Sequence, residues 1–173
     1  MKTVLITGPI ASGKSLCCRY LEKKGFPVYD CDSRTKALYD LIPGLKEKIE
    51  KELGIRWEQI GVIFSDDQKR RKLENIVYPL VLEDIKQWKS EQTNELVFIE
   101  SAIALEKPEF NESYDEVVMI VADRGLREQR NPAVTQRDHL QSFDLKRINQ
   151  VITNDGTQED LYLKIEELLC KLI

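Results

Sequence analysis

Short apolar runs alternate along this chain with longer segments in which apolar residues recur every three or four positions. The runs predict strands at residues 3–7, 27–30, 96–100, 116–121 and 150–153. Helical stretches between such strands, including a last helix over 158–172, are typical of a parallel sheet with helices on both faces. We therefore expect an α/β fold whose five strands have their carboxyl ends at one edge of the sheet.

The stretch between the second and third predicted strands, residues 33–90, reads as mostly helical. Ser33 is a candidate N-cap for a helix over 35–41. Apolar residues at helical spacing over 73–88 predict a long amphipathic helix, kinked or interrupted near Pro79. We expect this stripe to be packing surface within a helical insertion.

Composition and charge narrow the class of protein. The chain has 173 residues, 42% apolar and 32% charged, which fits one globular domain. A net charge of −4 argues against a nucleic-acid partner, and no apolar run is long enough to cross a membrane. The four cysteines form no C-x-x-C pair, so no zinc site is predicted. With no signal-peptide pattern after Met1, we expect a cytoplasmic protein, with a monomer favoured.

A glycine-rich motif follows the first strand. Residues 8–15 read GPIASGKS, the pattern G-x-x-x-x-G-K-S of a phosphate-binding loop, and the helix after it ends at Gly25. In such a loop backbone N–H groups surround a phosphate, Lys14 adds charge, and the Ser15 hydroxyl can bind Mg²⁺. A chance glycine-rich turn is the alternative. The residues expected around the phosphates of ATP are Gly8, Pro9, Ile10, Ala11, Ser12, Gly13, Lys14, Ser15 and Leu16.

A kinase also needs a carboxylate near the acceptor hydroxyl and a cation over the phosphates. Asp32 follows the second strand and could orient or deprotonate that hydroxyl, or it could simply favour a helix N-terminus. Glu100 ends the third strand and is a candidate second ligand for Mg²⁺. Residues 124–149 are rich in arginine and predict an exposed helical lid, with a solvated surface segment as the alternative. His139 in this segment is expected at the surface.

Taken together, these runs resemble the dephospho-coenzyme A kinase family over nearly the whole chain. Residues 5–15 are similar to the family's L-T-G-G-I-G-S-G-K-S/T, and residues 25–32 to its G-x-P-V-I-D-A-D. Residues 77–81 resemble H-P-x-V/I with Tyr78 in place of histidine, 100–103 read as the variant E-S-A-I, and 151–156 match V-I-x-N-D/N-G. The lid resembles R-D-x-L…R-I-x-x-Q less closely.

The resemblance implies a single phosphate-binding-loop kinase domain over 1–173, of the nucleoside-monophosphate-kinase type. It implies transfer of the γ-phosphoryl group of ATP, with Mg²⁺, to the ribose 3′-hydroxyl of dephospho-CoA. Lys14, Asp32 and Arg137 are then the catalytic residues, with Arg130 as the alternative to Arg137. An acceptor-binding insertion is implied at about 33–90 and a short lid at about 124–149. The residues implied on the acceptor side are Thr7, Asp32, Lys36 and Tyr78, although Lys36 could instead lie on a solvated helix face.

The chain departs from the family pattern in its loop and its lid. Pro9 replaces a glycine and removes an N–H group, and Ala11 carries a Cβ, so we expect a negative φ there. Family members carry about a dozen more residues between the lid glutamine, here Gln150, and the last strand. Two alternatives therefore stand beside a working kinase: a nucleotide- or CoA-binding protein without turnover, and a kinase for another small acceptor such as a nucleoside or a sugar acid.

Overall fold

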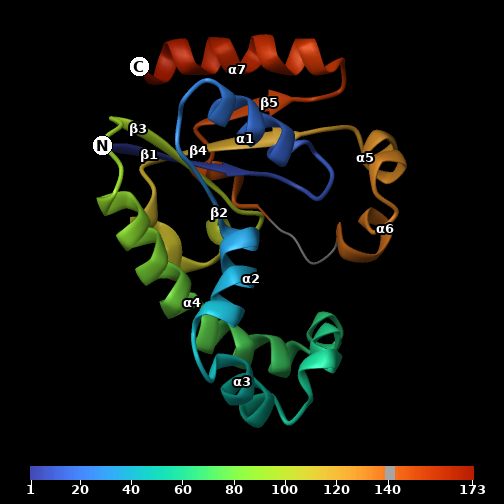
Figure 1. Cartoon of the computed structure of the whole chain (residues 1–173). Coiled ribbons are helices and arrows are strands. Elements are labelled where there is room, and N and C mark those ends of the chain that lie inside the picture. The colour runs from blue at the N-terminus through green and yellow to red at the C-terminus, as the bar shows by residue number, and fades with distance from the viewer. Residues whose placement is uncertain (139–142) are drawn as a thin grey trace. The chain divides into compact units, whose positions relative to one another are not determined.

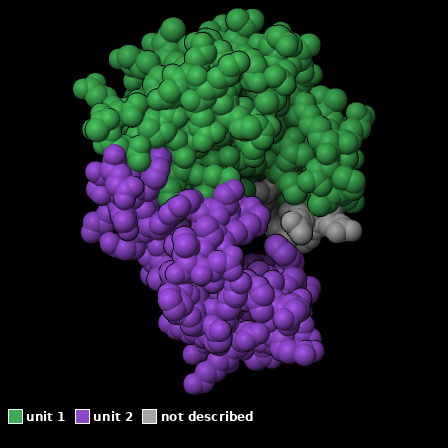
Figure 2. Space-filling model, viewed as in Figure 1, with its two compact units in different colours: residues 1–30, 92–173 green, residues 31–91 purple. Residues whose placement is uncertain are grey.

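The computed structural model describes residues 1–138 and 143–173, without the side chains of Gln136 and Arg137. His139 lies outside the described residues. The chain divides into two compact units, which Figure 2 colours separately: unit 1 comprises residues 1–30 and 92–173, and unit 2 residues 31–91.

Unit 1 is built on a five-stranded sheet in which all neighbouring strands are parallel, in the order β2-β3-β1-β4-β5 (Figure 1). The strands are β1 (Lys2–Thr7), β2 (Val28–Asp30), β3 (Leu96–Glu100), β4 (Glu116–Val121) and β5 (Gln150–Thr153). The predicted α/β class is confirmed, and the last three strands have the predicted bounds. β2 begins one residue later than predicted, after Pro27, which has no N–H group to donate to a ladder.

Two helices, α1 (Lys14–Lys23) and α7 (Gln158–Leu172), lie side by side along one face of the sheet (Figure 1). Their apolar sides share a buried cluster with alternate strand residues, among them Val4, Ile6, Phe98, Leu21 and Ile165. Because strand side chains alternate between faces, the opposite face carries Leu5, Val97, Ile99 and Val117, which are also buried. The sheet is therefore apolar on both sides, as parallel sheets generally are.

The remaining elements of unit 1 are short. They are η2 (Ala104–Glu106), η3 (Pro108–Ser113), α5 (Arg124–Arg130), α6 (Val134–Arg137) and η5 (Leu145–Arg147). Strand register brings two carboxylates together at the carboxyl edge of the sheet, because Asp30 is paired with Glu100. The loop that leads from β1 into α1 leaves the sheet at this edge.

Unit 2 contains α2 (Cys31–Leu41), α3 (Leu45–Leu53), η1 (Trp57–Phe64) and α4 (Asp67–Ser90). Ser33 was expected as an N-cap, but α2 begins at Cys31, directly after β2, so Ser33 lies inside the helix. Asp32 instead lies in the first turn of α2, where its negative charge interacts favourably with the positive end of the helix dipole.

Helix α4 runs without interruption through Pro79 for 24 residues. Of the two expectations at Pro79, the interruption was therefore wrong, whereas a kink there stays a prediction. Proline removes one backbone hydrogen bond, but Leu73, Val77, Val81 and Ile85 form a buried stripe on both sides of it, and this packing holds the flanking turns. Within residues 1–138 and 143–173, no helix is both long enough and apolar enough to cross a membrane.

Candidate active site

The phosphate-binding loop depends on two glycines that other parts of the chain approach closely. Gly8 has a φ of +140° and Gly13 a φ of +106°, which L side chains rarely adopt. A Cβ on Gly8 would lie 2.0 Å from the carbonyl oxygen of Ile120, and a Cβ on Gly13 would lie 2.2 Å from Nδ2 of Asn154. Both positions therefore require glycine for space as well as for backbone conformation.

Ala11 has a φ of +61°, so the expected negative φ was wrong. The left-handed conformation costs a residue with a Cβ about 1–2 kcal/mol. Such strain persists only where the surroundings fix the backbone. Donors around the loop supply that restraint.

Every carbonyl oxygen from Gly8 to Gly13 accepts a hydrogen bond. Lys14 Nζ donates to Gly8 and Pro9 at 2.9 and 3.1 Å, Arg127 to Ile10 at 3.3 Å, Arg130 to Ala11 at 3.4 Å, Asn154 Nδ2 to Ser12 at 2.8 Å, and the Cys17 N–H to Gly13 at 3.0 Å. In a planar trans peptide the N–H points away from the C=O. Holding these carbonyls therefore also sets the directions of the loop amides, the groups that bind anions in such loops.

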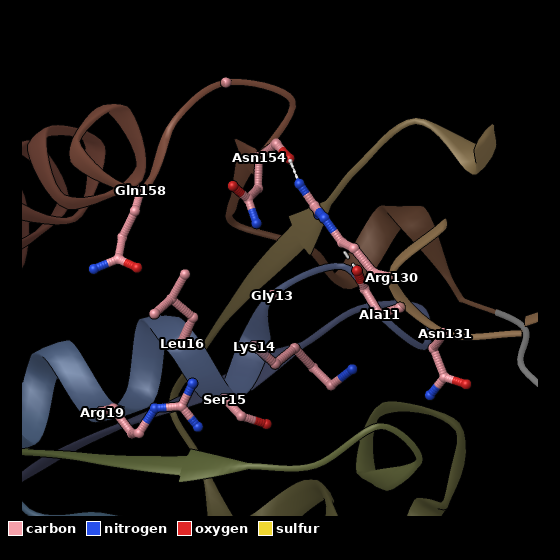
Figure 3. Close-up of a pocket in the computed structure, with 11 residues that line it drawn as sticks. Ala11, Gly13, Lys14, Ser15, Leu16, Arg19, Arg130, Asn131, Asn154 and Gln158 are labelled. Carbon is pink, nitrogen blue, oxygen red and sulfur yellow. Dashed lines mark hydrogen bonds between the residues drawn. The ribbon is translucent and has the colours of Figure 1, made fainter. Parts of the chain in front are cut away.

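A pocket of about 390 Å³ opens over the loop and the first turns of α1. Figure 3 shows Lys14 and Ser15 beneath it, with Arg130 reaching across to the backbone of Asn154. Its lining residues are Ala11, Gly13, Lys14, Ser15, Leu16, Arg19, Arg130, Asn131, Asn154, Gly156 and Gln158. The motif predicted the loop residues in this set. The 151–156 match signalled Asn154 and Gly156, whereas no sequence pattern signalled Arg19, Asn131 or Gln158.

Ser15 and Glu100 bring two side-chain oxygens together beside the pocket. Ser15 Oγ donates to Glu100 Oε1 at 2.8 Å, and Glu100 is only 9% exposed. Burial raises the pKa of Glu100, although the hydrogen bond from Ser15 opposes that shift. Among the described residues, no group of three or more His, Cys, Asp or Glu side chains could hold a metal ion. Mg²⁺ in kinase sites is commonly bound by one or two protein oxygens together with substrate phosphates and water, and this pair fits that pattern.

Burial also shapes the chemistry of the groups around Glu100. Burial lowers the pKa of Lys14, and the nearby Glu100 carboxylate acts in the opposite direction. Behind the loop, burial raises the pKa of Cys17 to about 12 and also raises that of Cys18, which hydrogen-bonds Glu100. Both thiols are therefore protonated at neutral pH and serve as packing groups.

The other predicted site residues have different surroundings. Asp32, Lys36 and Tyr78 belong to unit 2, where Lys36 Nζ lies 2.7 Å from Asp32 Oδ2 and both side chains are exposed. Thr7 ends β1 and is fully buried, and its hydroxyl has no hydrogen-bond partner among the described residues. Arg137 is the last residue of α6, and its side chain lies outside the described part of the chain. The roles of these five residues remain predictions.

The composition of residues 124–149 predicted an exposed helical lid, and the arginines of this segment that the structure describes differ in exposure. Arg127 is only 7% exposed, and Arg130 is bound to the loop. Arg147 donates to Leu105 O at 2.7 Å and to Asn111 Oδ1 at 2.6 Å, so it secures η2 and η3. The contacts of Arg127 and Arg147 with distant backbone atoms explain why these side chains are not free in solvent.

Comparisons with known proteins indicate the family of this chain. The family described as "CoaE: Dephospho-CoA kinase" matches residues 2–160. A dephospho-CoA kinase of Porphyromonas gingivalis is 37% identical over 139 residues, covering 75% of this chain and 68% of the relative. A dephospho-CoA kinase of Rickettsia typhi is 34% identical over 158 residues, covering 87% and 78%. The crystal structure of TT1252 from Thermus thermophilus superimposes with a TM-score of 0.83 at 25% identity, covering 99% and 98%. The chain belongs to the dephospho-CoA kinase family.

Proposed function

We propose that this chain transfers the γ-phosphoryl group of ATP to the ribose 3′-hydroxyl of dephospho-CoA, giving coenzyme A and ADP. The observation that carries the proposal is the loop of residues 8–13, whose carbonyls are all held by donors, next to Ser15 and Glu100. Family membership supplies the acceptor. In phosphoryl transfer the protein mainly positions the reactants and neutralises charge, and the backbone N–H groups and Lys14 of this loop can do both.

Lys14 is the cation that we expect on the transferred group. Its ammonium already lies within hydrogen-bond distance of two loop carbonyls, those of Gly8 and Pro9. A phosphate oxygen carries more negative charge than a carbonyl, so bound ATP draws the ammonium from these carbonyls onto the β- and γ-phosphates. Arg137 is the arginine that we expect over the phosphates, with Arg130 as the alternative; the position of Arg130 in the lining of this pocket supports the alternative.

Ser15 and Glu100 would hold Mg²⁺, because a hydroxyl and a buried carboxylate 2.8 Å apart supply the oxygen ligands that this ion prefers. Bound there, Mg²⁺ supplies positive charge against the phosphate oxygens. The chain's own part is to keep both oxygens in place, and the buried position of Glu100 does this.

On the acceptor side, we propose that Asp32 orients the 3′-hydroxyl and accepts its proton. Lys36 holds the Asp32 carboxylate at 2.7 Å and would release it to bind phosphates of the acceptor. Thr7 and Tyr78 complete the predicted acceptor contacts. Because ATP and dephospho-CoA are intracellular metabolites, the cytoplasm is the compartment that we propose.

The test is ADP release from Mg-ATP with and without dephospho-CoA. We expect Lys14→Ala to abolish release, and Asp32→Asn to lower turnover by about 10²–10⁴-fold while ATP binding is kept. Asp40→Asn is the matched control, since Asp40 is an exposed acid on the same helix, α2. If wild-type protein binds ATP by calorimetry but dephospho-CoA stimulates no release, the proposal is wrong. A screen of nucleosides and sugar acids would then separate another acceptor from a binding protein without turnover.

A further inference from the structure

Among the contacts that the structure describes, only the guanidinium of Arg127 joins the phosphate-binding loop to the end of α6. Its Nε donates to Ala122 O at 3.2 Å, and one terminal nitrogen donates to Ile10 O at 3.3 Å. Both terminal nitrogens also donate to the Asp138 carboxylate, at 2.6 and 3.1 Å. The side chain is almost fully buried, so all its nitrogens are engaged away from solvent.

The geometry of the guanidinium makes this contact directional. A bidentate pair with a carboxylate fixes the plane of an arginine, and that plane then fixes where the remaining N–H groups point. The backbone position of Arg127 is fixed as well, because Asp123 caps α5 by accepting from Gly125 N at 2.8 Å, and Arg127 N donates to Asp123 O at 3.0 Å. The N–H group that meets Ile10 O therefore comes from a rigid support.

The peptide between Ile10 and Ala11 is the part of the loop with most need of such support. Ala11 is held at a φ of +61°, and it lines the pocket. With the Ile10 carbonyl bound by Arg127, the Ala11 N–H is directed the opposite way. A reversal of this peptide would relieve the strain on Ala11 and withdraw that N–H group from a bound anion.

We propose that Arg127 is a positioning residue for nucleotide binding. Through Ile10 O it keeps the Ala11 amide presented to the nucleotide phosphates. Through Asp138 it ties the end of α6, and with it the backbone of Arg137, to the same point of the loop. This inference rests on the proposed function only in taking a nucleotide as the ligand of the loop. A merely structural pair between α5 and Asp138 would contribute to folding without affecting nucleotide affinity.

The experiment measures dissociation constants for ADP by calorimetry, because ADP binding needs no acceptor. We expect Arg127→Lys, which keeps the charge but loses the fork, to weaken ADP binding by about tenfold or more. Asp138→Asn should have a smaller effect in the same direction. The KM for ATP should rise in these variants, whereas the KM for dephospho-CoA should stay within about twofold of the wild-type value. The control is Arg124→Lys, since Arg124 lies on the same helix, is 64% exposed and pairs with Glu128 one turn further along; this variant should bind ADP like wild type.

A rescue variant separates positioning from folding. Adding Ala11→Gly to Arg127→Lys removes the cost of the left-handed conformation, so part of the lost ADP affinity, about threefold or more, should return. Folded Arg127→Lys and Asp138→Asn proteins that bind ADP within about twofold of wild type would overturn the inference, as would an equal loss in Arg124→Lys or no rescue by Ala11→Gly. If Arg127→Lys does not fold, Asp138→Asn decides. Wild-type protein that binds ADP without phosphorylating dephospho-CoA would refute the proposed function alone.

Discussion

Gly13 and Asn154 lie so close together that the effects of replacing them on stability should not add. A Cβ on Gly13 would lie 2.2 Å from the Asn154 amide nitrogen, so Gly13→Ala must push the amide away from Ser12 O, which it binds at 2.8 Å. Leaving a buried carbonyl without its donor costs about 1–3 kcal/mol. The φ of +106° costs any L side chain about 1–3 kcal/mol more. Gly13→Ala alone should therefore lower the free energy of unfolding by about 2–6 kcal/mol.

Asn154→Ala loses the same hydrogen bond, at about 1–3 kcal/mol, and at the same time opens the space that a Cβ on Gly13 needs. In that background Gly13→Ala retains only its backbone cost. The double variant should therefore be more stable than the sum of the two single effects predicts, by about 1–3 kcal/mol, the value of the shared hydrogen bond.

Urea unfolding of wild type, the two single variants and the double variant, without nucleotide, measures this coupling energy. Gly8→Ala combined with Asn154→Ala is the matched control. A Cβ on Gly8 would meet the backbone oxygen of Ile120, which no change at Asn154 relieves, so those two costs should add. If the Gly13 and Asn154 effects add within about 0.5 kcal/mol, the steric reasoning is refuted.

Three further predictions concern the loop and its neighbours. Ala11→Gly should raise the Tm by about 1–4 °C in scanning calorimetry, because relief of the left-handed strain exceeds the entropy that glycine adds to the unfolded chain; a lower Tm would contradict this. Burial raises the pKa of Glu100, so ionisation of this carboxyl destabilises the fold as pH rises above the pKa that it has in the unfolded chain, and Glu100→Gln should raise the Tm at pH 7. In a metal titration of activity, the same variant should need about 10–100-fold more Mg²⁺ for half-maximal turnover. The hydrogen bond from Arg127 lowers the pKa of Asp138, so the stability that this ion pair contributes is present above about pH 4 and is lost as pH falls through the pKa of Asp138 in the folded protein. The urea midpoint of Asp138→Asn should therefore decline less on acidification than that of wild type.

The strands could be predicted from the sequence because each is a short apolar run bounded by polar residues or turns. Helix boundaries depend on more than local preference. Ser33 is a good N-cap type, but the chain passes from β2 into α2 at Cys31 without a connecting loop, and no local pattern shows this. Pro79 was rightly seen as a helix breaker in isolation, whereas the buried stripe that keeps α4 continuous depends on tertiary packing.

The candidate site divides in the same way. Residues 8–15 are contiguous, so their spacing alone predicted the loop. Three of the donors that hold the loop carbonyls, Arg127, Arg130 and Asn154, come from positions more than 100 residues later, and sequence periodicity cannot show that they reach the loop. Arg127 looked like one of several solvated arginines. Its burial depends on Asp138, whose place relative to α5 is fixed only in the folded chain.

Helix α5 and the segment after β5 both hold the phosphate-binding loop, and they are hydrogen-bonded to each other. This explains how the loop keeps its conformation with fewer glycines than the family pattern has. Arg130 donates to Asn154 O at 3.0 Å, and Asp155 accepts from Asp123 N at 2.7 Å, so the segment after β5 and the start of α5 form one hydrogen-bonded network. In a glycine-rich loop, positive φ angles carry little cost and the loop needs few outside contacts. Here Ala11 is strained, and the loop therefore depends on donors from outside its own sequence. Weakening that network should impair nucleotide binding even though none of the loop motif has changed.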